Sequence, residues 1–96
     1  MVVGILQIEI GIDGSQSLKD KRRVVSSLKD RLHREHQVSV AEVDRLDDHR
    51  VAVLGITMAS NSVSHCQSVM DRLTEKLRGG RGFVLNDQNL QILSGQ

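Results

Sequence analysis

The 96-residue sequence predicts an α+β fold in which two helices pack on one face of a four-stranded antiparallel sheet. Some segments alternate apolar residues as strands do, and two others repeat them with the three-four spacing of helices. Proline is absent and the turns are short, which indicates one domain over residues 1–96 without disordered segments. The single cysteine excludes a disulfide framework within the chain.

The N-terminal segment 2–12 alternates strictly and predicts a central strand. One face is fully apolar and carries Val2, Gly4, Leu6, Ile8, Ile10 and Ile12. After the turn GIDGSQ at 11–16, Ser17 stands three residues before Asp20, the spacing of a capping box at a helix start. The buried stripe of this helix is formed by Val24, Val25, Leu28 and Leu32.

The remaining segments complete the order β-α-β-β-α-β. Residues 38–43 and 51–59 read as strands joined through a polar turn at 45–49, which predicts a hairpin. A second helix begins after Asn61 or Ser62, stops at Gly79 and Gly80, and is followed by an edge strand at 83–94. This order is the split βαβ arrangement of ferredoxin-like domains.

Three blocks of the sequence also resemble a known family. They read SLKDKRRVVSSLKDRL at 17–32, VSVAEVD at 38–44 and AVLGITMASN at 52–61. In this order and spacing they are similar to the YlxP-like family of small bacterial proteins, whose biochemical function is not established. The resemblance covers about residues 1–78 and implies a ferredoxin-like fold. The genes of this family accompany transcription and translation factors, which suggests a role near RNA or the ribosome, and the resemblance implies no catalytic residues.

The formal net charge is only +1, but positive charge is concentrated in the first helix. Seven lysines and arginines lie between Ser15 and Gln37, against three acidic residues. On a helical wheel Arg22, Lys29 and His33 share a sector about 60° wide beside the apolar stripe, so they could follow one phosphate backbone. The candidate RNA- or phosphate-binding residues are Lys21, Arg22, Arg23, Lys29 and His33. An ordinary solvated helix face is the alternative interpretation.

Lys21 differs from the other candidates because its wheel position falls within the apolar stripe. An unpaired ammonium is costly to bury. The Lys21 side chain must therefore either bend past the helix start and reach solvent or place its ammonium near the sheet edge, and we expect the first.

The sheet face away from the helices predicts a second class of function. It is apolar for a surface in contact with water, and the candidate interface residues on it are Val3, Ile5, Val51, Val53 and Thr57. A face-to-face homodimer would cover this face, and so would another protein docked on it. A protein-interaction module is therefore the alternative to RNA binding.

No constellation of residues indicates an enzyme. The chain lacks a G-x-x-x-x-G-K-[ST] phosphate loop, and no arginine lies between Gly11 and Ser17, where an acylphosphatase of this fold would need one. Cys66 has a core position in the second helix and is expected to be an inert thiol. We predict no catalytic residues, cofactor or small-molecule substrate.

Two further patterns have ordinary structural interpretations. The acidic cluster from Glu42 to Asp48 could surround a divalent cation, but it is more typical of a hairpin facing solvent, so no metal site is predicted. The RGGRG segment at 78–82 is expected to end a helix and leave Arg78 and Arg81 in solvent. No apolar run is long enough to span a membrane, and a cytoplasmic location is expected.

Overall fold

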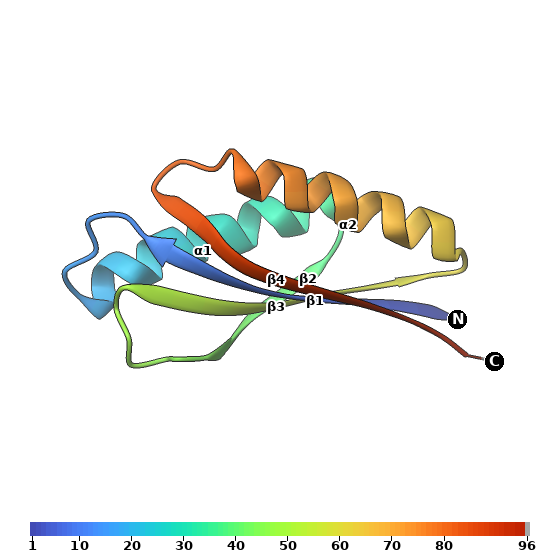
Figure 1. Cartoon of the computed structure of the whole chain (residues 1–96), viewed down its shortest axis with the longest axis horizontal. Coiled ribbons are helices and arrows are strands. Elements are labelled where there is room, and N and C mark those ends of the chain that lie inside the picture. Colours follow the sequence, from blue (N-terminus) through green and yellow to red (C-terminus); the bar gives the residue numbers. More distant parts are fainter. Residues whose placement is uncertain (96) are drawn as a thin grey trace.

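A computed structural model describes residues 1–95 and has the predicted order of elements (Figure 1). Gln96, which the predicted domain included, lies outside the described residues. The elements are β1 (Val2–Ile12), α1 (Leu18–His36), β2 (Ser39–Asp44), β3 (Val51–Ser60), α2 (Val63–Arg78) and β4 (Phe83–Ser94). The predicted α+β fold class is confirmed.

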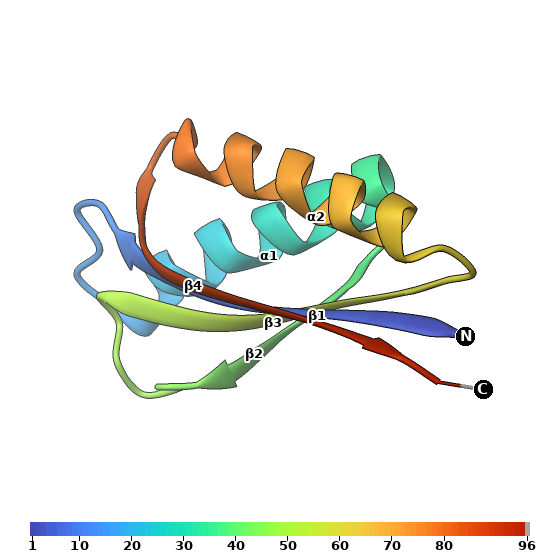
Figure 2. The same ribbon diagram turned by 45° about the vertical axis from the view of Figure 1, so that its right-hand side comes forward.

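The four strands form one antiparallel sheet in the order β2-β3-β1-β4. β1 is central and pairs with β3 on one side and β4 on the other, as its apolar face predicts. β4 is an edge strand, as predicted. Both helices lie on the same side of the sheet, so within residues 1–95 its opposite face carries no helix (Figures 1 and 2).

Side-chain caps fix where the helices begin. The Ser17 hydroxyl accepts a hydrogen bond from the Asp20 N–H at 3.1 Å, and the Asp20 carboxylate accepts one from the Gln16 N–H at 2.9 Å. Ser62, one of the two predicted caps, accepts from the His65 N–H at 3.2 Å. These contacts satisfy backbone donors that have no partner within the helix.

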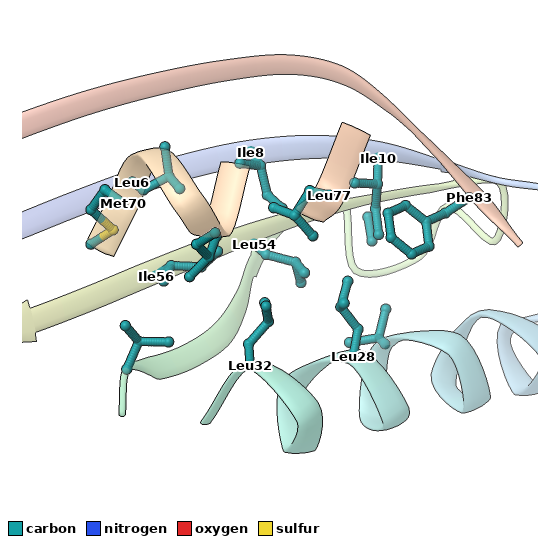
Figure 3. Packing of buried hydrophobic residues seen from close by; sticks show 14 of the residues in the cluster. Leu6, Ile8, Ile10, Leu28, Leu32, Leu54, Ile56, Met70, Leu77 and Phe83 are labelled. Atoms are coloured by element: carbon teal, nitrogen blue, oxygen red, sulfur yellow. The ribbon is translucent and has the colours of Figure 1, made fainter. Parts of the chain in front are cut away.

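The core fills the space between the helices and the apolar face of the sheet (Figure 3). Leu28 and Leu32 of α1 point toward the sheet, and α2 contributes Met70 and Leu77. Cys66 is fully buried, which confirms its core position, and burial raises the pKa of its thiol.

Phe83 closes one end of this core, below the turn that joins α2 to β4. The side chain is 4% exposed and packs beside the backbone of Gly80. A Cβ atom at Gly80 would lie only 2.1 Å from the Phe83 ring, so the close approach requires glycine at this position. The turn therefore lies directly over a buried aromatic ring.

Candidate functional site

The basic residues predicted as a binding surface lie on α1, whose buried side contacts the sheet. Arg22, Arg23 and His33 are exposed and Lys29 is half-buried. Within residues 1–95, neither of these arginines nor Lys29 belongs to any of the ion pairs. Three of the predicted cations are therefore available to an anionic ligand.

His33 is exposed, but one ring nitrogen already has a partner. Its Nδ1–H donates a hydrogen bond to the carbonyl of Val38 at 2.9 Å, across the connection between α1 and β2. This contact fixes the ring at the end of the helix and leaves Nε2 as the atom that could meet a ligand.

The prediction that Lys21 reaches solvent is wrong. Its side chain is 1% exposed, and Nζ lies 2.7 Å from Glu42 Oε2. The ammonium also donates hydrogen bonds to the carbonyls of Arg45 at 2.9 Å and Val51 at 3.1 Å. These partners compensate for the free energy that the ammonium loses when it is removed from water. Lys21 therefore cannot contact RNA in the folded protein and leaves the set of phosphate-binding candidates.

Glu42 also differs from its expected place on a solvent-facing hairpin. It pairs in register with Leu54, whose side chain is buried on the helix side of the sheet, and its own side chain is 19% exposed. Its Oε2 atom is buried and, within residues 1–95, has no partner besides the Lys21 ammonium. The ion pair thus connects the β2–β3 hairpin to α1.

Among the described residues, no group of three or more His, Cys, Asp or Glu side chains is arranged to hold a metal ion.

A second group of basic side chains lies between α1 and the turn from α2 to β4. A groove of about 260 Å³ is lined there by Arg23, Ser27 and Arg31 of α1 and by Arg81 of the turn, above Val24, Leu28 and Phe83. Arg23, Ser27 and Arg31 follow one another at four-residue intervals and so share one face of the helix. The sequence prediction left Arg81 in solvent and did not associate it with Arg23. The four-residue spacing of Arg23, Ser27 and Arg31 is visible in the sequence, but the position of Arg81 next to them depends on how α2 packs.

The open face of the sheet is divided into two halves, and the first of them is apolar. Register places Val3 between Ala59 of β3 and Leu93 of β4, forming a row across three strands. Ile5 lies next to this row, between Thr57 and Gln91. The described structure leaves Val3 and Ile5 half-buried and Leu93 54% exposed. The predicted interface residues Val3, Ile5 and Thr57 therefore do lie together.

The other half of the open face is polar. Arg45 Nη1 lies 3.3 Å from Glu9 Oε1, which spans the distance from the end of β2 to β1. Val53 lies between Glu9 and Asp44 in register, so the Arg45 side chain must cross β3 at this residue. Val53 is only 6% exposed and offers little surface to a partner, so its place at an interface stays a prediction. Val51, which is half-buried, also belongs to this half because it pairs with Gly11.

The end of α1 and one side of α2, from His65 to Lys76, border a larger groove of about 900 Å³ with mixed charge. Lys76 forms an ion pair with Glu35 here, and this contact lowers the pKa of the Glu35 carboxyl. Burial, followed by the positive charge of Lys76, lowers the pKa of His36. The His36 Nε2 atom is buried and has no hydrogen-bond partner in residues 1–95. The imidazole is therefore held in an environment that favours its neutral form.

Comparisons with known proteins identify the fold and a family. No curated protein matches the chain. A de novo designed protein with ferredoxin fold, solved by solution NMR, superposes with a TM-score of 0.53 at 16% sequence identity, covering 97% of this chain and 84% of the design. This likeness supports the fold alone.

Neither helix in the part of the chain that the structure describes is long and apolar enough to cross a membrane.

The resemblance to YlxP-like proteins stays a prediction. The family model described as "Protein of unknown function (DUF503)" matches residues 3–89. The chain therefore belongs to the DUF503 family of proteins of unknown function.

Proposed function

We propose that the protein is a non-catalytic cytoplasmic domain that binds single-stranded RNA, free or in the ribosome, along the exposed side of α1. The observation that carries this proposal is the set of free cations Arg22, Arg23 and Lys29 on that side. Of the three acidic residues of the helix, Asp20 caps its start and Glu35 is paired with Lys76, so Asp30 remains to offset part of their charge. Such cations bind phosphates without reading the sequence of the bases.

The supply of aromatic side chains limits how RNA could be recognised. Phe83 is the single aromatic residue of the sequence, and its ring is buried in the core. Proteins that read single-stranded RNA usually stack its bases on exposed aromatic rings. Recognition by this protein should therefore depend on charge and shape, with little preference for sequence.

The proposal is tested by measuring RNA affinity against salt concentration, using fluorescence anisotropy of a labelled single-stranded oligonucleotide. Three phosphate contacts should give a logarithmic slope of about −2, since each contact to a single strand contributes about −0.7. The double variant Arg22→Ala/Lys29→Ala removes two contacts, so affinity should fall and the slope should approach about −0.7.

The matched control is Arg50→Ala/Arg72→Ala, which removes the same charge from exposed positions outside α1. It should retain most of the affinity. Equal losses in both double variants would mean general charge attraction and no located site. Undetectable binding near 100 mM salt would also contradict the proposal.

The apolar half of the open sheet face supports a second candidate function, self-association of two copies. Its row of Ala59, Val3 and Leu93 is a surface that a twofold-related copy could cover. Sedimentation should then give about twice the chain mass of 10.7 kDa. Leu93→Glu should restore the monomer, while Leu46→Glu, at a 59% exposed position in the β2–β3 connection, should not. A wild-type monomer at all concentrations would exclude this function.

A further inference from the structure

The groove between α1 and the α2–β4 turn contains a concentration of positive charge that binding along the RNA backbone does not require. Its lining includes Arg23, Arg31 and Arg81 and no carboxylate. Each arginine is exposed, and none belongs to an ion pair within residues 1–95. We propose that this groove is a binding site for a phosphate dianion, the terminal group of a phosphate monoester or a pyrophosphate.

The two arginines of α1 approach the groove from either side of a hydroxyl group. Arg23 and Arg31 lie one helical repeat before and after Ser27, on the same helix face. The Ser27 hydroxyl makes no hydrogen bond to another side chain or to the backbone among residues 1–95, so it is free to donate to an oxyanion. A planar guanidinium on each side can bind two phosphate oxygens at once.

Arg81 is supplied by a turn whose backbone is held in place on both sides. The Gly80 N–H donates to the carbonyl of Leu77 at 3.2 Å, and the carbonyl of Gly82 accepts from the Asp13 N–H at 3.0 Å. The Phe83 ring supports the turn from below, at the contact with Gly80. The position from which the third guanidinium enters the groove is therefore fixed before any ligand binds, which lowers the entropic cost of binding.

One acidic residue close to Arg31 and Arg81 is already paired. Glu35 lies one turn after Arg31 on α1, but its carboxylate is bound by Lys76 of α2. Arg31 thus keeps its guanidinium available to an added anion, although its positive charge still attracts the Glu35 carboxylate over a longer distance. An anion in the groove would meet three cations without having to displace an internal carboxylate.

The size of the groove and its charge together define the ligand class. Its volume of about 260 Å³ is smaller than the roughly 300–1,000 Å³ of sites that enclose drug-sized molecules, so it suits one small charged group. Three arginines favour a dianion over the single negative charge of a phosphodiester. The dianion could be the end of an RNA or part of a small phosphorylated molecule.

The test follows the amide resonances of isotope-labelled protein during titration with sodium pyrophosphate at constant ionic strength. Binding should be saturable, with the largest shifts at Ser27, Arg81 and Gly82. Arg81→Ala should weaken binding at least about tenfold, since it removes a charge-assisted contact. Arg78→Ala, which removes the same side chain one turn earlier and outside the groove, should bind pyrophosphate as the wild type does.

The inference is overturned if pyrophosphate has no more effect than sodium chloride at equal ionic strength, or if Arg78→Ala weakens binding as much as Arg81→Ala. The RNA proposal is tested separately, because Arg22→Ala/Lys29→Ala should leave pyrophosphate binding unchanged. Oligonucleotides with a 5′-phosphate or a 5′-hydroxyl distinguish the source of the ligand. Tighter binding of the phosphorylated form, lost in Arg81→Ala, assigns the site to RNA ends, and equal binding of both forms assigns it to a small phosphorylated molecule.

Discussion

Removing one partner of the Lys21–Glu42 ion pair should destabilise the protein by more than an ordinary surface substitution does. Glu42→Leu leaves an ammonium that is 1% exposed and whose remaining partners among residues 1–95 are the carbonyls of Arg45, Leu46 and Val51. Breaking a buried pair in this way costs about 3–5 kcal/mol. The glutamate is 19% exposed and the three carbonyls remain, so we expect the lower end, about 3 kcal/mol.

Lys21→Met should cost less, about 2 kcal/mol, because the partly exposed Glu42 side chain can turn its carboxylate into water at the sheet edge, while the carbonyls lose their donor. Replacing both partners removes the buried charge altogether. The double variant Lys21→Met/Glu42→Leu should therefore also cost about 2 kcal/mol, well below the sum of about 5 kcal/mol expected from independent substitutions.

The assay is urea unfolding at pH 7, followed by circular dichroism, with the four proteins of the cycle measured together. The exposed Arg78–Glu75 pair is the control, and substitutions there should change the unfolding free energy by less than about 0.5 kcal/mol. A double variant that loses the full sum would refute the reasoning. So would a Glu42→Leu variant within about 1 kcal/mol of the wild type.

Three further predictions concern single residues. Gly80→Ala should destabilise the protein by about 1–3 kcal/mol in urea unfolding, because the new methyl group collides with the Phe83 ring, and an unchanged stability would contradict the close packing. Because burial and the Lys76 charge lower the pKa of His36 in the folded state, the unfolded chain binds that proton more tightly, and the unfolding free energy should decrease as the pH falls below about 6.5. His36→Gln should reduce this decrease between pH 7.5 and 5.5, and an identical pH profile would argue against it. Cys66 should react with a thiol reagent about 100-fold more slowly in the native protein than in denaturant, and equal rates would show that the thiol is accessible.

The sequence was sufficient to predict the fold because its local patterns agree with one another. Strict alternation in β1 matches its central place in the sheet, and Ser17 and Ser62 mark both helix starts. The same reasoning placed Lys21 correctly in the buried stripe of α1. It could not supply the partner, because Glu42 faces the helix only through the pairing of β2 with β3.

The candidate sites were less predictable because they depend on contacts between distant segments. Nothing local to Val53 shows that Arg45 crosses above it toward Glu9. Arg81 likewise meets Arg23 only after α2 has packed against the sheet and α1. Helical wheels and strand alternation describe single elements, and these arrangements arise between elements.

The central position of β1 also determines when the sheet can be completed as the chain is synthesised. β1 is made first, yet one of its two edges pairs with β4, the last strand. Until Phe83–Ser94 have left the exit tunnel, the nascent chain presents an unpaired apolar strand edge, the kind of surface that promotes aggregation. A chain that ends before β4 should therefore aggregate or require a chaperone, even though β4 lies at the periphery of the finished sheet.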